Sequence, residues 1–218
     1  LAMIARLYGI EIELIMPENA TRERDQTMRA YGAKVTLTPA AGGIEGARDM
    51  ADQRVQQEGS VMLDQFSNPD NWKAHYKSTG PEIWDDTRGK VTHFVSSMGT
   101  TGTIIGTSSF LKEKNPEVTI VGVQPDGDSS IPGIRKWPKA YLPKIFDASK
   151  VDRIIEVSAA EARETARDLA SEEGIFAGMS SGGATAAALK LAKELKAGTI
   201  VSIICDRGDR YLSSDLFE

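Results

Sequence analysis

The sequence predicts an α/β fold with a mainly parallel β-sheet flanked by helices. The main reason is that short apolar runs alternate with helical runs along almost the whole chain. Parallel strands need crossover connections, which are usually helices, and these helices cover both faces of the sheet. The chain has 218 residues, 40% hydrophobic and 26% charged, so it can bury a core without disulfides or metal.

The alternation starts at the N-terminus. Residues 1–8 read as the later part of an amphipathic helix that stops at Gly9, and residues 10–16 read as a strand stopped by Pro17. A charged helix at 21–31 begins at Thr21, a strand follows at 34–38, and 43–58 has apolar residues on one helical face. We expect a further strand at 61–63. Because the first helix begins in its middle, we expect the sequence to be truncated.

The pattern continues to the C-terminus. Residues 71–86 are expected to form one or two helices interrupted at Gly80-Pro81, and 92–96 and 118–123 are expected strands around a helix at 103–114. The segment 126–149 is rich in Pro, Gly and Lys and is expected to be a loop. A strand at 153–157, helices at 159–173 and 181–195, and an apolar strand at 199–205 complete the set.

The composition excludes several classes of function. The net charge is −5, with 31 acidic against 26 basic residues, which disfavours a nucleic-acid partner. No apolar run approaches the roughly 20 residues of a membrane span. The lone cysteine, Cys205, excludes an internal disulfide and fits a reducing, cytoplasmic compartment. Because it ends a strand of buried type, we expect a small core thiol.

A glycine-rich segment, Ser96–Thr103, joins an expected strand to an expected helix. Gly99 and Gly102 permit positive φ and close backbone approach, and successive N–H groups at a helix start can bind an anion. The segment contains no lysine or arginine, so it is neither a Walker loop nor a dinucleotide fingerprint. Alone, it fits a phosphate site and a plain threonine-capped turn equally well.

Several motifs, in order, resemble one family, the fold-type II pyridoxal-phosphate (PLP) enzymes, and specifically cysteine synthases (O-acetylserine sulfhydrylases). They are Gln65–Asn71, Thr79–Trp84, Gly99–Thr103 and Glu173–Gly183. The loops 129–138 and 204–213 are similar to the B-type enzymes rather than the A-type. The resemblance covers essentially the whole chain.

The resemblance implies a set of site residues. The PLP-binding residues would be Gly99, Thr100, Thr101, Gly102, Thr103 and Ser180. Ser180 would face the pyridine nitrogen, with Ser181 as the neighbouring alternative, and a serine there also suits an N-cap of the alanine-rich helix. Gln65 would lie near the substrate carboxylate, or is a polar strand-end residue. Arg210, or less favourably Arg207, would attract an anionic sulfur donor, or belongs to a solvated charge cluster.

The family's Schiff-base lysine lies in a Ser-Val-Lys-Asp-Arg-like run, and its substrate-carboxylate loop is a Thr-Ser-Gly-Asn-Thr-Gly-like run. Neither is present, so no catalytic residue is assigned in this chain. We expect the chain as given to be inactive and unable to bind PLP covalently. His75 and His93 receive no role, no metal site is expected, and Trp72, Trp84 and Trp137 are interpreted as packing residues.

The resemblance implies PLP-dependent β-replacement, making cysteine from O-acetylserine and sulfide or thiosulfate. Cystathionine β-synthase, a serine or threonine dehydratase, and a non-catalytic module of the same fold are the alternatives. We expect residues 1–90 to be the remainder of a smaller N-terminal domain with a crossover segment, and 91–218 a larger PLP-binding domain. Small-molecule substrates and a homodimer are the expected partners.

Overall fold

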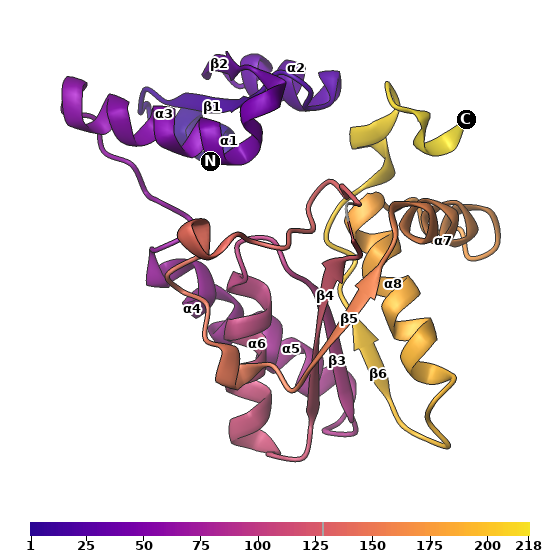
Figure 1. Cartoon of the computed structure of the whole chain (residues 1–218). Coiled ribbons are helices and arrows are strands. Elements are labelled where there is room, and N and C mark those ends of the chain that lie inside the picture. Colours follow the sequence, from indigo (N-terminus) through magenta and orange to yellow (C-terminus); the bar gives the residue numbers. More distant parts are fainter. Residues whose placement is uncertain (128) are drawn as a thin grey trace. The chain divides into compact units, whose positions relative to one another are not determined.

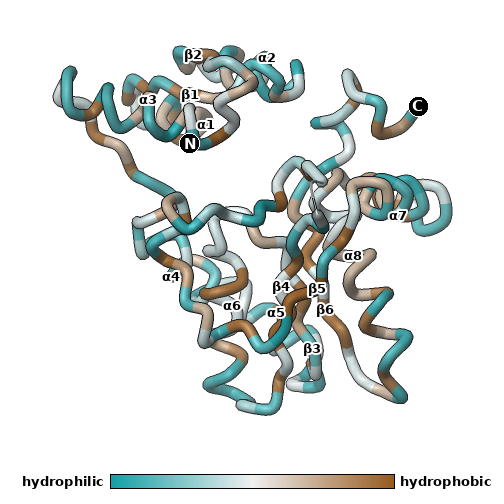
Figure 2. The backbone as a smooth tube through the Cα atoms, viewed as in Figure 1, coloured by the Kyte–Doolittle hydropathy of each residue, from teal (hydrophilic) through white to brown (hydrophobic). Residues whose placement is uncertain are grey.

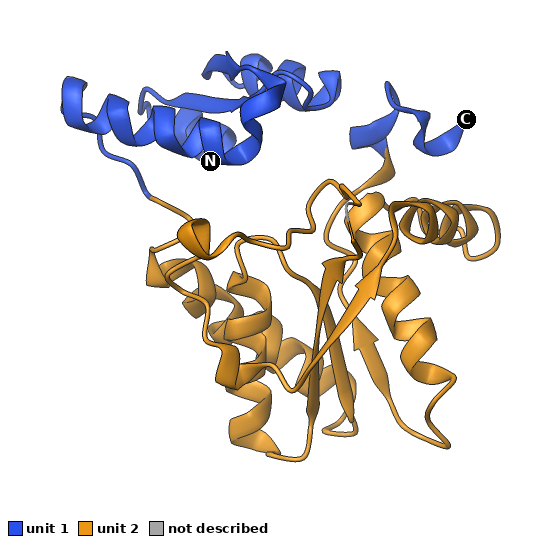
Figure 3. Cartoon of the chain, viewed as in Figure 1, with its two compact units in different colours: residues 1–63, 209–218 blue, residues 64–208 orange. Residues whose placement is uncertain are grey.

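The computed structural model describes residues 1–127 and 129–218. Contacts divide the chain into two compact units: unit 1 comprises Leu1–Leu63 and Asp209–Glu218, and unit 2 comprises Asp64–Gly208 (Figure 3). By their contacts, the helices between residues 69 and 86 belong to unit 2. The domain division at residue 90 stays a prediction.

Unit 1 contains a two-stranded parallel sheet in which Glu13 pairs with Lys34 and Pro17 with Thr38. Its elements are α1 (Ala2–Leu7), β1 (Glu13–Pro17), α2 (Arg22–Ala30), β2 (Lys34–Thr38), η1 (Ala40–Gly42), α3 (Gly43–Glu58) and η5 (Asp215–Phe217). The C-terminal segment is anchored by buried Tyr211 and Leu216. Arg24 donates to the Tyr211 hydroxyl (2.8 Å) and lies over its ring.

Unit 2 contains a four-stranded parallel sheet of order β5-β4-β3-β6. Its strands are β3 (His93–Ser97), β4 (Thr119–Pro125), β5 (Arg153–Val157) and β6 (Ile200–Ser202). Its helices are α4 (Pro69–Lys77), α5 (Thr79–Asp86), α6 (Gly102–Lys114), η2 (Lys139–Tyr141), η3 (Ala148–Lys150), α7 (Ala159–Ser171), α8 (Met179–Ala192) and η4 (Gly208–Tyr211), the last of which crosses into unit 1. The predicted α/β fold with a parallel sheet is confirmed.

Helices cover both faces of this sheet (Figure 1). The connection β3–α6–β4 runs across the sheet in one direction, and the connection from β5 through α7 and α8 to β6 runs back in the other. Because parallel crossovers are right-handed, the two connections lie on opposite faces. Apolar residues concentrate on the strands, whereas much of α7 is polar (Figure 2). The core between α5, α6 and the sheet consists of Ile83, Val91, Phe94, Met98, Ile104, Ile105, Leu111, Val118 and Ile120.

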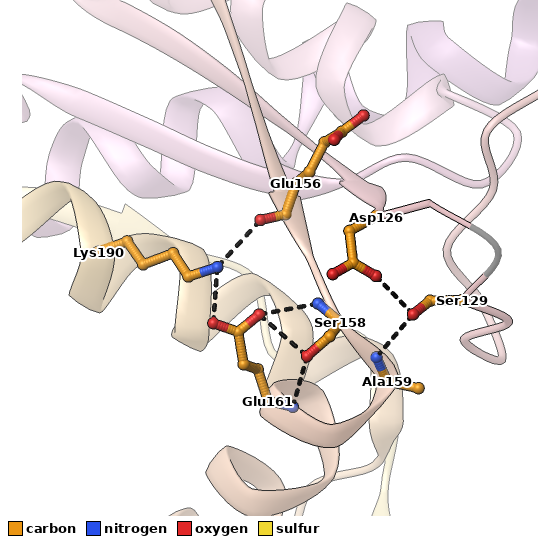
Figure 4. Close-up of polar contacts among 7 residues, drawn as sticks. All are labelled: Asp126, Ser129, Glu156, Ser158, Ala159, Glu161 and Lys190. Carbon is orange, nitrogen blue, oxygen red and sulfur yellow. Dashed lines mark hydrogen bonds and ion pairs between the residues drawn. The ribbon is translucent and has the colours of Figure 1, made fainter.

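A polar cluster joins the end of β4 to the start of α7 (Figure 4). Ser158 and Glu161 form a reciprocal capping box, in which the Ser158 hydroxyl accepts from the Glu161 N–H and the Glu161 carboxylate accepts from the Ser158 N–H. Lys190 of α8 forms an ion pair with Glu161 at 2.7 Å. Ser129 donates to Asp126 (2.5 Å) and lies 3.4 Å from the Ala159 nitrogen, so the loop after β4 is tied to α7.

Several expected boundaries are wrong. Residues 61–63 form no strand, because no neighbouring strand pairs with them, and Val61 is 88% exposed. The expected interruption between two helices lies at Ser78, between α4 and α5, and not at Gly80-Pro81, because proline is tolerated in the first turn of α5, where its missing N–H is not needed. β6 ends at Ser202 as an edge strand. Of the expected loop 126–149, Asp128 lies outside the described residues.

Candidate functional site

The candidate site lies at the carboxyl ends of β3 and β6, beside the first turn of α8. The Ser97 hydroxyl, at the end of β3, donates to the Ser180 carbonyl at 2.8 Å. The Ser180 hydroxyl lies 3.1 Å from the sulfur of Cys205, which follows β6. Ligands of doubly wound parallel sheets bind beyond this edge. The predicted glycine-rich loop and Ser180 are therefore brought together in unit 2.

The loop after β3 is arranged for an anion. Thr101, the N-cap of α6, has φ of 71° and is buried, and its hydroxyl oxygen has no hydrogen-bond partner among the described residues. A β-branched residue in this backbone region costs about 1–3 kcal/mol, and a buried unpaired hydroxyl costs a similar amount. The Thr101 side chain does not cap α6, and the N–H groups of the first turn have no intrahelical acceptor, although the Gly102 N–H lies 3.4 Å from the Thr100 hydroxyl oxygen.

Neighbouring residues hold this loop from several directions. The indole N–H of Trp137 donates to the Gly99 carbonyl at 2.6 Å, and the Arg135 N–H donates to the Met98 carbonyl at 2.8 Å. The Asn71 side chain contacts the Thr100 hydroxyl at 3.1 Å. Trp137 is therefore more than the packing residue that the sequence predicted, whereas Trp72 and Trp84 do pack against the core.

Ser180 is fixed in the first turn of α8. The helix begins at Met179 with Gly178 as its N-cap, so the expected serine N-cap is wrong. Instead, the Asp206 carboxylate accepts from the N–H groups of Ser180 (3.3 Å) and Ser181 (3.0 Å), and from the Ser181 hydroxyl (2.5 Å). A carboxylate is well placed at a helix N-terminus. Because Asp206 occupies the Ser181 hydroxyl, Ser180 is the better candidate for contact with a ligand.

Gly133 brings the loop after β4 against Ser180. Its φ is 88°, and a Cβ at this position would lie 2.9 Å from the Ser180 hydroxyl oxygen. Residues with a side chain rarely adopt this backbone conformation, and here a side chain would also collide with the site. The close approach lets the loop form one wall beside the Ser180 hydroxyl.

Cys205 is not the core thiol that the sequence predicted. Because β6 ends at Ser202, Cys205 lies in the following loop and is exposed as a residue. Desolvation of its sulfur raises the pKa of the thiol above its ordinary value. The Ser180 hydrogen bond opposes this rise in pKa, and the charge of Asp206 adds to it. The protonated thiol is therefore the favoured form at neutral pH.

His75 is a site neighbour that the sequence did not single out. Its Nε2 lies 3.3 Å from the Thr103 hydroxyl, and its Nδ1 lies 2.9 Å from the Thr79 hydroxyl. Desolvation lowers the pKa of the imidazole, which favours its neutral form. The sequence carried no signal for this contact, because the two partners come from α6 and α5 while His75 lies on α4.

The two predicted substrate-binding residues lie in different units. Gln65 belongs to unit 2, is exposed, and accepts a hydrogen bond from Asn71 through its carbonyl. Arg210 lies in η4 and belongs to unit 1. Arg207 forms an isolated antiparallel bridge with Ala177. The roles of Gln65, Arg207 and Arg210 stay predictions.

A family profile described as "Pyridoxal-phosphate dependent enzyme" matches residues 1–206. The chain belongs to this family. The chain is 59% identical to cysteine synthase B of Pseudomonas aeruginosa and 56% identical to that of Escherichia coli, covering all of this chain and 73% and 72% of the relatives. Its identity to cysteine synthase A of Escherichia coli is 39%, over 73% of that protein. The B-type resemblance is therefore confirmed.

Solved structures of the pyridoxal-phosphate dependent enzymes have the same fold. An O-ureido-L-serine synthase superposes with a TM-score of 0.91 at 36% identity, covering 100% of this chain and 72% of that protein. A cysteine synthase from Entamoeba histolytica superposes with a TM-score of 0.90 at 36% identity, covering 99% and 67%. The fold of the chain is therefore the fold of these solved enzymes.

The residues present fit the cofactor of this family. The buried Thr101 hydroxyl, which has no hydrogen-bond partner in the described part of the chain, and the first turn of α6 suit the phosphate of PLP, which needs donors rather than acceptors. The Ser180 hydroxyl offers a neutral partner to a ring nitrogen. Among the described residues, no cluster of His, Cys, Asp or Glu is arranged to hold a metal ion, and no helix is both long and apolar enough to cross a membrane.

Proposed function

We propose that this chain carries the cofactor site of a B-type cysteine synthase, which makes cysteine from O-acetylserine and sulfide or thiosulfate. The observation that carries the proposal is the pairing, in one site, of an anion-ready loop with the hydroxyl of Ser180. The higher identity to cysteine synthase B than to cysteine synthase A supports the B-type assignment. Bound PLP supplies the electron sink for loss of acetate and addition of sulfur.

In this proposal the chain's own residues bind the cofactor and orient it and the substrates. The loop Gly99–Thr103 binds the phosphate through backbone N–H groups and threonine hydroxyls, without a positive side chain. Ser180 contacts the ring nitrogen through a hydroxyl. A hydroxyl does not hold that nitrogen protonated as a carboxylate would, which favours β-elimination over transamination. Gln65 lies on the substrate side, and Arg210 attracts an anionic sulfur donor.

A lysine in the family's Schiff-base motif is absent from these 218 residues. We therefore expect the chain, mixed with PLP, to form no specific Schiff base at one lysine. Borohydride treatment followed by peptide mapping checks this: a single lysine of this chain that carries the reduced cofactor in stoichiometric amount would contradict the expectation.

The activity is tested by joining the chain to an N-terminal segment of the Pseudomonas aeruginosa relative that carries the Schiff-base motif, since this chain covers 73% of that protein. The joined protein is expected to form cysteine from O-acetylserine with sulfide, thiosulfate or both. A joined protein that folds and binds PLP but forms no cysteine would contradict the proposed function. The same protein with its Schiff-base lysine replaced by alanine is the control.

One alternative activity has a specific observation in its favour. An O-acetylserine dependent cystathionine β-synthase from Helicobacter pylori superposes with a TM-score of 0.90 at 34% identity, over 100% of this chain and 74% of that protein. Supplying homocysteine in place of sulfide distinguishes the two activities. If cystathionine forms faster with homocysteine than cysteine forms with sulfide, the alternative activity is favoured. Pyruvate released from serine would indicate a dehydratase instead.

We also propose a cytoplasmic homodimer, as the family resemblance implies. The lone cysteine is compatible with a reducing compartment. Sedimentation equilibrium of the joined protein tests the dimer, and a monomer at micromolar concentration would contradict it.

A further inference from the structure

Asn71 links the predicted substrate-side segment to the loop after β3. It lies in the first turn of α4, and its Nδ2 atom is 2.7 Å from the Gln65 carbonyl and 3.1 Å from the Thr100 hydroxyl oxygen. One side-chain atom therefore contacts two segments of the chain, one at Gln65 and the other at Thr100.

The direction of both hydrogen bonds follows from the Gln65 carbonyl. A carbonyl oxygen can only accept, so the atom that faces it must be the amide nitrogen of Asn71 and not its oxygen. That nitrogen carries two hydrogens, one for each partner. Asn71 is therefore a donor to the Thr100 hydroxyl oxygen as well.

The Thr100 hydroxyl receives a second donor, the N–H of Gly102, at 3.4 Å. A hydroxyl has two acceptor lone pairs and one proton. With both lone pairs turned toward donors, the proton must point to a third partner. We propose that Asn71 is a positioning residue, which keeps the Thr100 hydroxyl a hydrogen-bond donor to the phosphate of the cofactor. This inference rests on the proposed cofactor site.

Close packing holds Asn71 in this place. A Cβ on Gly102 would lie 1.9 Å from the Asn71 side-chain oxygen, and a Cβ on Gly106 would lie 2.0 Å from the Trp72 carbonyl. The absence of side chains at these two positions of α6 allows α4 to lie directly against it. Asn71 therefore acts on Thr100 from a fixed helix.

Substitutions of different hydrogen-bonding character separate this role from simple packing. In Asn71→Asp, a carboxylate of nearly the same shape would accept the Thr100 proton and turn it away from the phosphate. In Asn71→Ala, the donor is lost but no competing acceptor is added. A residue that only packs would tolerate the aspartate better than the alanine, whereas the proposal predicts the opposite order.

The experiment compares binding of pyridoxamine 5′-phosphate and of pyridoxamine to the full chain by isothermal titration calorimetry. Neither probe needs a Schiff-base lysine, and their affinity ratio isolates the phosphate contribution. We expect Asn71→Asp to lower this ratio about tenfold or more, and Asn71→Ala to lower it about threefold. Asn115→Asp, the same change at the other end of α6, where Asn115 accepts from the Glu117 N–H, is expected to leave the ratio unchanged.

A ratio in Asn71→Asp equal to that of the unchanged chain, or a smaller loss than in Asn71→Ala, would overturn the inference. An unchanged chain that binds both probes equally would instead overturn the proposed phosphate site. If Asn71→Asp does not fold, as judged by circular dichroism, the cycle of Asn71→Ala and Thr100→Val decides. Its two losses are expected to be strongly non-additive, and additive losses would overturn the role of Asn71.

Discussion

The contact between Ser180 and Cys205 can be followed through the reactivity of the Cys205 sulfur. Cys205 is the lone cysteine of the sequence, so a thiol reagent modifies this site alone. Its sulfur lies 3.1 Å from the Ser180 hydroxyl, at the carboxyl end of the sheet. The reactivity of the thiol therefore depends on the position of Ser180.

We expect alkylation of Cys205 by iodoacetamide to follow a pH profile shifted above that of a free thiol. Desolvation raises the pKa of the thiol, and thiolate is the reactive form. In Ser180→Ala the profile is expected to move further up, because the Ser180 hydrogen bond lowers the pKa. Ser171→Ala is the control. A profile at or below that of a free thiol would contradict the structure around Cys205.

Ser180→Asp tests the proposed contact with the ring nitrogen. In the joined protein, we expect this variant to bind PLP but to lose most β-replacement activity, because a carboxylate would hold the nitrogen protonated. The new carboxylate would also lie close to Asp206, whose oxygens accept from the backbone of the same turn. Unchanged turnover in a variant that binds PLP would refute the role of Ser180.

At this scale, the sequence predicted the chemistry of the loop better than its conformation. The Gly and Thr content of Gly99–Thr103 pointed to an anion site, but nothing local indicated that Thr101, rather than a glycine, adopts positive φ. The Asp206 contact with α8 was equally hidden, since it spans 25 positions between Asp206 and Ser181 and depends on the end of β6.

Among the elements, α7 offers a direct measure of capping. We expect Ser158→Ala to lower the free energy of unfolding by about 1 kcal/mol, because it removes the hydroxyl that accepts from the Glu161 N–H. Ser171→Ala, at the other end of the helix, is the matched control and is expected to change stability by less than about 0.5 kcal/mol. Urea denaturation of both variants measures the difference, and equal losses would contradict a capping role.

The bounds of an element were predictable where the local sequence marks both of its ends. The bounds of β2, α3 and β5 agree with the sequence expectation, because each carries its own stop signals. The expected strand at 61–63 fails because a strand depends on a partner that the local sequence does not reveal. The start of α8 was misplaced by two residues, because the carboxylate that accepts from its first-turn N–H groups belongs to Asp206, far along the chain.

For the whole molecule, the two histidines predict a loss of stability in acid. Desolvation lowers the pKa of His75 and of His93 below the ordinary 6.5. The unfolded chain therefore binds more protons below that pH, so stability is fully present above pH 6.5 and falls as the pH drops. Urea denaturation at about pH 7.5 and 5.5 is expected to show the loss, and His75→Gln is expected to reduce it. If the stability of His75→Gln has the same pH dependence as that of the unchanged chain, the loss in acid does not come from His75.

The C-terminal segment is expected to stabilise unit 1 in particular. Leu216 is 1% exposed, and truncating it to alanine is expected to cost about 2–5 kcal/mol in the stability of that unit. Hydrogen exchange is the measurement: protection should fall in β1 and β2 and persist in β3 and β4. Leu212→Ala is the control, because Leu212 is 65% exposed. Equal loss of protection in both units would show that the segment acts on the whole chain.

Unit 1 is built from two separate stretches of the chain, and this affects the order in which the two units can fold during synthesis. Unit 2 is one continuous stretch, whereas unit 1 needs both the first and the last residues of the chain. During synthesis, residues 1–63 must wait until the stretch that contains Tyr211 and Leu216 has emerged. All residues of unit 2 precede the last residues of unit 1, so we expect the sheet of four strands to form first in a growing chain.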